Sequence, residues 1–274
     1  MEHQQRLAIR ISRGSIAFSY LRTGAWQAGS AANGMEVAFE RYAIKSSISL
    51  AANMREALRT MPLLQQSFER VTVMVDSPVM LVPTDLYVSE EQEELYRYTF
   101  TQQEQEMVLS HVLPDLNAVA VFSIRKDLRT VLTDSFGAAV RFRPVMATVW
   151  RHFHHRSYTG PRNKLYTYFH DHRVEVFSFA KNRFRFCNSY AIGTNPDDAL
   201  FYILSAWKQL GFEALEDELH LSGNIPGREE FIGNAGKYVK RVFTVNPSGE
   251  FNRAPVTQIT GMPYDMMLVY LNEK

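Results

Sequence analysis

Within the first 75 residues, apolar and polar positions alternate with a period of two, then recur at helical spacing, and end in a short apolar run. Period-two stretches predict strands, whereas apolar side chains three and four residues apart predict a helix. Ser49 precedes the helical stretch and can cap it. The predicted elements are a hairpin over residues 6–23 with its turn at Arg13-Gly14-Ser15, a strand over 37–44, a helix to about Met61 and a buried strand over 71–75.

The same order of elements returns in the second half of the chain. Alternation resumes at residue 165 and predicts another hairpin, a third strand, a helix and a fourth strand. The helix has Asn195 as its cap and Pro196 in its first turn. The repeated elements are a hairpin around Asp171-His172-Arg173, a strand over 183–192, a helix from about residue 196 and a strand over 219–221, which breaks into a glycine turn before a further helix.

Matching positions in the two halves keep a fixed offset. Tyr-Ala-Ile at 42–44 stands 148 positions before Tyr-Ala-Ile at 190–192, and Pro78 stands 148 positions before Pro226. The hairpins match at an offset of 158, and the difference of ten residues falls in the Gly-Ala loop at 25–35, where an insertion costs little. Chance could produce one short identity, but a shared element order with one register favours an internal duplication.

Additional elements lie between the two copies. The pattern predicts a short strand over 79–83, an acidic helix over 90–98, a strand over 118–124, a helix over 126–136, a strand over 138–142 and a helix from Pro144 to Ser157. Thr159-Gly160-Pro161-Arg162-Asn163 has the composition of a linker. We therefore expect a first domain over 1–158, with a small inserted subdomain at about 79–117, and a second domain over 163–274.

This α/β organisation, with β-β-β-α-β present twice, resembles the actin-like ATPase fold, which consists of two ribonuclease H-like domains flanking a cleft. The strand, proline turn and strand at 71–83, followed by the acidic helix, resemble the actin-like proteins of pilus assembly and type II secretion. The chain also resembles an uncharacterised bacterial family with this fold. These resemblances imply the fold, and they imply an interaction or scaffold role more than an enzymatic one.

The resemblance implies phosphate-binding turns in both hairpins. ATPases of this class have Asp-x-Gly in the first, where the chain has Ser12-Arg13-Gly14, and a serine hydroxyl cannot offset the charge of magnesium as a carboxylate does. We expect Gly14 to keep the turn permissive. In the second hairpin, His170-Asp171-His172-Arg173 has an aspartate but no glycine, so side chains would fill the room that a phosphate needs.

The adenosine-binding corner of such ATPases has paired glycines after a buried strand. Here the corresponding residues are Ser222-Gly223-Asn224, and asparagine tolerates left-handed backbone geometry. Because each motif is only half present, we expect degenerate nucleotide binding, no catalytic residue, no metal and no cofactor. The candidate cleft positions are Ser12, Arg13, Gly14, His172, Ser222, Gly223 and Asn224.

The alternative is a divergent ATP-dependent phosphotransferase or ATPase that uses Mg-ATP and Asp76 or Asp171 as its base. Asp76 before Ser77-Pro78 is also typical of a turn-capping residue. Gly233-Asn234-Ala235-Gly236-Lys237-Tyr238 lacks the spacing and the hydroxyl of a P-loop, and we expect it to pack a helix closely against its neighbour. His152, His154 and His155 could bind a metal, but no other ligand motif accompanies them, so we interpret them as packing or solvated side chains.

Charge and composition limit the kinds of partner that the chain is expected to bind. Thirty basic and 29 acidic residues leave a formal charge of +1, which offers no general attraction for nucleic acid or an anionic membrane. No apolar window reaches the 18 residues of a membrane span, no signal peptide is recognisable, and the single cysteine, Cys187, cannot form an internal disulfide. We expect a cytoplasmic, non-catalytic protein whose partner is another protein.

Overall fold

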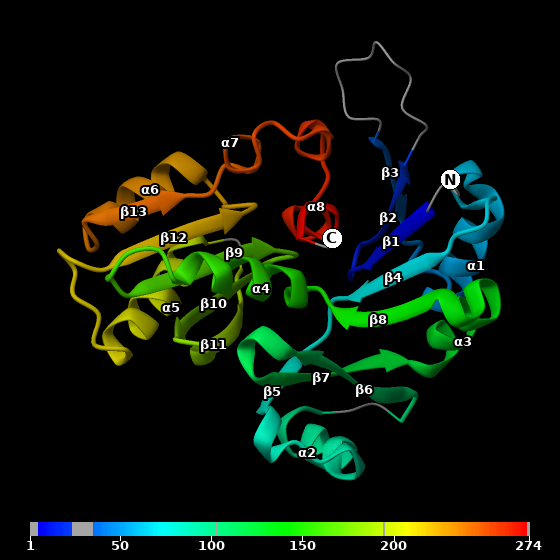
Figure 1. Ribbon diagram of the computed structural model, residues 1–274, viewed down its shortest axis with the longest axis horizontal. Coiled ribbons are helices and arrows are strands. Elements are labelled where there is room, and N and C mark those ends of the chain that lie inside the picture. Colours follow the sequence, from blue (N-terminus) through cyan, green and yellow to red (C-terminus); the bar gives the residue numbers. More distant parts are fainter. Residues whose placement is uncertain (1–4, 24–34, 102–103, 194, 273–274) are drawn as a thin grey trace. The chain divides into compact units, whose positions relative to one another are not determined.

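The computed structural model describes residues 5–23, 35–101, 104–193 and 195–272 (Figure 1). The predicted ten-residue insertion at 25–35 therefore falls outside the described residues, apart from Met35. The chain forms two compact units. The first comprises Met1–Thr148 together with Ala254–Lys274, and the second comprises Val149–Arg253.

A five-stranded sheet forms the centre of the first unit, with strand order β3-β2-β1-β4-β8. The first three strands are antiparallel neighbours, whereas β4 pairs parallel with β1 and β8 pairs parallel with β4. This confirms the hairpin, third strand and buried fourth strand that the alternation predicts. The strands are β1 (Gln5–Ile11), β2 (Ser15–Thr23), β3 (Met35–Ala43), β4 (Arg70–Val75) and β8 (Val140–Pro144).

Helices α1 (Leu50–Thr60) and α3 (Lys126–Phe136) cover one face of this sheet. The predicted cap is present, because the Ser49 hydroxyl accepts a hydrogen bond from the Ala52 amide at 3.1 Å. Alternate residues of β1 and β4 point to this face and are buried beneath the helices, namely Leu7, Ile9, Ile11, Val71, Val73 and Val75. Their burial from water is the main stabilising contribution of this half of the unit.

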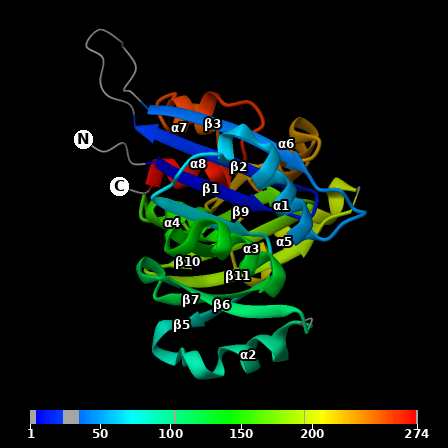
Figure 2. The ribbon, with the colours of Figure 1, turned by 90° about the vertical axis from the view of Figure 1, so that its right-hand side faces the viewer.

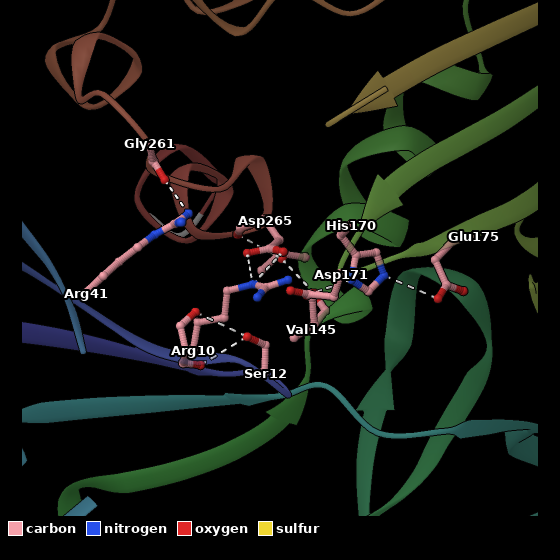
Figure 3. Close-up of polar contacts among 11 residues, drawn as sticks. Arg10, Ser12, Arg41, Val145, His170, Asp171, Glu175, Gly261 and Asp265 are labelled. Carbon is pink, nitrogen blue, oxygen red and sulfur yellow. Dashed lines mark hydrogen bonds and ion pairs between the residues drawn. The ribbon is translucent and has the colours of Figure 1, made fainter. Parts of the chain in front are cut away.

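The opposite face carries the C-terminal helix α8 (Tyr264–Asn272), whose methionines pack against Ala8, Ala17 and Met74. Arg10 of β1 and Asp265 of α8 form a buried ion pair, with 3.0 and 2.9 Å from the arginine Nε to the two carboxylate oxygens (Figure 3). The Tyr270 hydroxyl donates to the Ser19 carbonyl at 2.7 Å. Helix α8 is thus fixed over β1 and β2 by apolar packing and by directional polar contacts.

A second sheet in the first unit has the strand order β5-β7-β6 (Figure 2). Its strands are β5 (Val79–Pro83), β6 (Glu106–Leu113) and β7 (Ala118–Arg125), and helix α2 (Gln92–Thr99) packs on it through buried Tyr96. The sequence predicted a subdomain at about 79–117. The structure extends it to Arg125, because β7 is the central strand of this sheet and pairs with both of its neighbours.

The second unit repeats the first sheet, with order β11-β10-β9-β12-β13. Antiparallel pairing joins its first three strands, and parallel pairing adds β12 and β13, as in the first unit. The shared order confirms the duplicated architecture. The strands are β9 (Lys164–His170), β10 (Arg173–Ala180), β11 (Arg183–Ala191), β12 (Glu218–Gly223) and β13 (Arg241–Thr244).

Helices α5 (Pro196–Gln209) and α6 (Arg228–Gly236) cover one face of this sheet around buried Leu165, Phe169 and Leu219. The predicted cap is again present, since the Asn195 side chain accepts from the Asp197 amide. On the other face, Phe153 of α4 (Met146–Ser157) packs against both Tyr166 and Phe177, at ring distances of 4.9 and 5.8 Å. The alternating aromatics of β10 therefore belong to a core.

The structure corrects three predictions. The sequence assigned 163–274 to one domain, but residues 254–274 pack in the first unit, where Asp265 pairs with Arg10. The strand predicted at 138–142 begins two residues later, after a 3₁₀ turn at Gly137–Ala139. Strands β6 and β13 were not predicted, because β6 has little alternation of apolar and polar residues and β13 has only four residues. No helix among the described residues is long and apolar enough to cross a bilayer.

The buried ion pair predicts a large destabilisation when one partner is removed. Asp265→Ala should lower the free energy of unfolding by about 3–5 kcal/mol, because the guanidinium of Arg10 stays buried without this counter-charge. The double variant Arg10→Met/Asp265→Leu should recover part of that loss. Urea unfolding of both variants measures this, and equal stability of Asp265→Ala and the native chain would contradict it.

His220 of β12 predicts a pH dependence of stability. Burial lowers the pKa of His220, although its 3.0 Å contact with Glu218 opposes the shift and Arg156 and Lys164 add to it. The unfolded chain therefore binds more protons on this histidine as pH falls through its ordinary pKa of about 6.5. Unfolding free energy should fall between about pH 7 and pH 5, and His220→Phe should flatten this slope. An unchanged slope in the variant would exclude His220 as the cause.

Candidate functional site

In each unit the residue that follows the fourth strand is hydrogen bonded to the last part of the first strand. The Asp76 amide donates to the Ile11 carbonyl at 3.0 Å, and the Asn224 amide donates to the Phe169 carbonyl at 2.8 Å. The donors are 148 positions apart and the acceptors 158 positions apart, which are the two offsets read from the sequence. Each corner therefore lies beside the turn of its own hairpin.

A second pair of hydrogen bonds occurs at matching positions with the same two offsets. The Ile44 amide donates to the Gly14 carbonyl at 3.2 Å, and the Ile192 amide donates to the His172 carbonyl at 2.9 Å. The third strand in each unit thus ends against the hairpin turn. The structure places Ser12, Gly14 and Asp76 at one end of the first sheet. It places His172 and the Ser222–Asn224 corner at the matching end of the second sheet.

The first hairpin turn uses its own serine to close itself. Ser12 is buried, its amide donates to the Ser15 carbonyl at 3.1 Å, and its hydroxyl donates to the same carbonyl at 3.0 Å. Arg13 and Gly14 are exposed. Gly14 does not have the left-handed backbone that would require glycine, and a Cβ built on it would meet nothing within 4 Å. The turn has open space around Gly14, but its backbone geometry does not require glycine.

The second hairpin turn is made of two left-handed residues that are not glycine, Asp171 with φ 41° and His172 with φ 59°. They connect the paired residues His170 and Arg173. Two positive φ values give the twist of a tight hairpin, and aspartate tolerates this backbone better than most residues do. Both side chains therefore project from the positions where a phosphate-binding turn would have glycine.

A network of polar side chains, which includes buried His170 and Glu175, adjoins this second turn. His170 contacts the Asp171 carboxylate through Nδ1 at 3.1 Å and the Glu175 carboxylate through Nε2 at 3.3 Å, and the Ser189 hydroxyl donates to Glu175 at 2.8 Å (Figure 3). Asp171 is thereby engaged within its own hairpin. Glu175 was not predicted as part of this cluster, although a carboxylate between Val174 and Val176 on a mainly apolar strand was a usable signal.

Gly223 is required by its neighbours in the sheet. Its φ is +83°, and a Cβ at this position would lie 2.3 Å from the Phe169 carbonyl oxygen and 2.8 Å from the Tyr168 ring. The Ser222 hydroxyl donates to the Thr167 carbonyl of the same strand. The left-handed residue of the corner is Gly223, and Asn224 does not have a positive φ. Close contact between β12 and β9 explains this glycine.

These local contacts test whether the described residues fit Mg-ATP. The first turn presents a hydroxyl that is bonded to its own turn, where a magnesium-binding carboxylate is needed. The second turn has side chains at residues 171 and 172, where a phosphate-binding turn would approach its ligand. Gly223 of the corner packs against the backbone of Phe169. The first turn therefore has no carboxylate, and the second has no glycine, at the positions where the resemblance places them.

The histidines of α4 have protein partners. His152 contacts Glu250 of α7 (Pro247–Glu250) at 2.8 Å, and His154 contacts the Lys181 carbonyl at 3.1 Å and the Tyr158 hydroxyl at 2.9 Å. These contacts agree with packing roles. Close helix packing at Gly233 and Gly236 was a wrong prediction, because a Cβ on either glycine would meet nothing within 4 Å.

Comparison with solved structures identifies the class. The chain is similar over 99% of its length, and over 97% of the other chain, to a Bacteroides thetaiotaomicron protein with an actin-like ATPase fold and unknown function, at 25% identity and a TM-score of 0.81. It is similar to a chain of the PilM-PilN type IV pilus biogenesis complex over 89% of both chains, at 10% identity and a TM-score of 0.50. The protein has the actin-like ATPase fold.

A third structure, the cytoplasmic domain of EpsL from the type II secretion system of Vibrio cholerae, is 14% identical and aligns over 99% of this chain and 96% of that chain, with a TM-score of 0.44. No curated protein matches the sequence. The model of the DUF3822 family, described as a protein of unknown function, matches residues 1–242. The chain belongs to this family.

The corner predicts unequal effects for two nearby glycines that both have positive φ. Gly223→Ala should lower the free energy of unfolding by about 3 kcal/mol or more, because its methyl group would overlap the Phe169 carbonyl. Gly227→Ala, with φ +52° and open space, should cost only about 1 kcal/mol. Urea unfolding without ligand measures both, and equal effects would show that packing against β9 does not explain Gly223.

Proposed function

We propose that the protein is a non-catalytic, cytoplasmic actin-like module that acts by binding another protein, and that its nucleotide motifs are degenerate. The observation that carries this proposal is the contact between Gly223 and the Phe169 carbonyl, because it gives the last glycine of the adenosine corner a purely structural reason. The remaining phosphate-turn positions are Ser12, whose hydroxyl donates within its own turn, and His172, which has a side chain where the resemblance places glycine.

An interaction role is supported by the resemblance in fold to PilM, which was solved in a complex with PilN. The nearly balanced charge and the lack of a membrane-spanning helix among the described residues are compatible with such a role. Aspartates remain at two of the candidate positions. Asp171 contributes to the His170 network, and Asp76 forms the corner beside Ile11. Asp171 thus has a structural role within its own unit, and the backbone amide of Asp76 closes the corner of the other unit.

The proposal predicts that Mg-ATP at millimolar concentration leaves the melting temperature of the chain unchanged. A ligand present at a hundred times its dissociation constant would add about 2.7 kcal/mol to stability, which a melting curve detects easily. Release of phosphate from ATP should equal that of a buffer blank.

A matched variant makes this test decisive. Gly14→Tyr places a large side chain in the open first turn without overlapping any described atom at Cβ. A stabilisation by Mg-ATP that this variant abolishes would refute the ligand-free role. Phosphate release that Asp76→Asn or Asp171→Asn abolishes would establish the ATPase alternative instead.

A further inference from the structure

A cavity of about 540 Å³ lies wholly within the first unit, between the strand β8 at the edge of the five-stranded sheet and the strand β6 at the edge of the inserted sheet. Neighbouring β4 contributes Arg70 and Thr72 to its wall, and β8 contributes Arg141 and Arg143. None of these residues belongs to the candidate nucleotide-binding motifs. The volume is within the range of small-molecule sites, which is about 300–1,000 Å³.

The register of the sheet explains why the basic residues gather there. Thr72 is paired with Arg141 and Met74 with Arg143, so these residues share the sheet face on which Met74 contacts the α8 cluster. The polar contacts of α8 hold it over β1 and β2, where it bonds Arg10 and Ser19. At β4 and β8 the same face continues as the wall of the cavity.

The charge of the cavity wall is strongly positive. Arg70, Arg141 and Arg143 line it together with His111, and the only carboxylate among the lining residues is Glu69. Arg141 and Arg143 are two residues apart on one strand, which corresponds to about 7 Å at a rise of about 3.3 Å per residue. Like charges at this spacing repel each other, and a bound anion would relieve that repulsion.

Several donors around the cavity remain available for a ligand. Neither the Arg70 guanidinium nor the hydroxyls of Thr72 and Ser110 bond to any described residue. Arg141 donates through Nη1 to the Ala138 and Val140 carbonyls at 2.7 and 2.9 Å, which orients the group and leaves Nε and Nη2 for a ligand. Guanidinium groups and hydroxyls in this number suit the several oxygens of a phosphate or carboxylate group.

We propose that this cavity binds a small organic anion through a phosphate or carboxylate group held by Arg70, Arg141 and Thr72. The cavity is larger than an inorganic ion requires, and Val112, Phe142, Ala138 and Ala139 give it apolar walls beside the arginines. The ligand therefore combines an anionic group with an apolar body. Arg143, only 6% exposed, supplies positive charge from the buried end of the wall.

The test uses phenyl phosphate as probe, with phenol, inorganic phosphate, benzoate and citrate as comparison ligands. Binding to the complete chain is measured by NMR titration and by isothermal calorimetry at low and high salt. Phenyl phosphate or benzoate should bind more tightly than phenol or inorganic phosphate, and salt should weaken the binding. Comparison of phenyl phosphate with benzoate and citrate distinguishes a phosphate ligand from a carboxylate ligand.

Two charge-matched double variants locate the site. Arg70→Gln/Arg141→Gln should weaken binding by about tenfold for each arginine removed, whereas Arg55→Gln/Arg59→Gln on exposed positions of α1 should leave it unchanged. Thr72→Val tests the buried hydroxyl with little change of shape. Melting curves show that the variants are folded. No binding of any anion up to about 10 mM, or equal binding by both double variants, would overturn the proposal.

Discussion

The parallel pairing of the first and fourth strands is the constraint on which each unit depends. It brings the residue after the fourth strand to the end of the first strand, through Asp76 and Ile11 in one unit and Asn224 and Phe169 in the other. Once this pairing is set, the hairpin turn, the corner and the end of the third strand must lie together. The duplicated fold thus creates a cluster of turns in each unit whatever side chains occupy it.

The side chains at those turns decide what the clusters can do. In the first unit Ser12 closes its own turn, and in the second unit His170, Asp171 and Glu175 form a buried network. Gly223 satisfies a steric requirement of the sheet. A glycine, an aspartate and a serine at nucleotide-site positions are therefore all explained by local structure. Such residues are therefore weak evidence for ATP binding, because each also takes part in contacts within its own unit.

Local patterns in the sequence predicted most of the elements and the duplication. Period-two alternation located the hairpins, Ser49 and Asn195 marked the helix starts, and the two offsets reappear as matched hydrogen bonds. Backbone angles were less predictable. Gly14 and Asn224 do not have the left-handed geometry expected from their types, whereas Asp171 and His172 do. Residue type biases a dihedral angle, but strand pairing fixes it.

Local sequence patterns could not predict contacts between residues that are far apart in the chain. No signal near residue 265 indicates that its carboxylate contacts Arg10, 255 positions earlier, and so residues 254–274 were assigned to the wrong unit. The same limit applies to the arginine-lined wall of the cavity. Arg141 and Arg143 are visible in the sequence as polar positions of a strand, but only the register with β4 puts Arg70 and Thr72 beside them.

The two copies have diverged most where the fold is least constrained. Between the fourth strand and the next helix the first unit contains β5, α2, β6 and β7, whereas the second passes from β12 through a short turn into α6. The insertion adds a sheet edge opposite β8, and the basic cavity lies where that edge meets the duplicated sheet. Turns shared by both copies are accounted for by the fold itself. A feature that is present in only one copy is not explained by the duplicated fold. A function specific to this family is therefore best sought in the inserted subdomain.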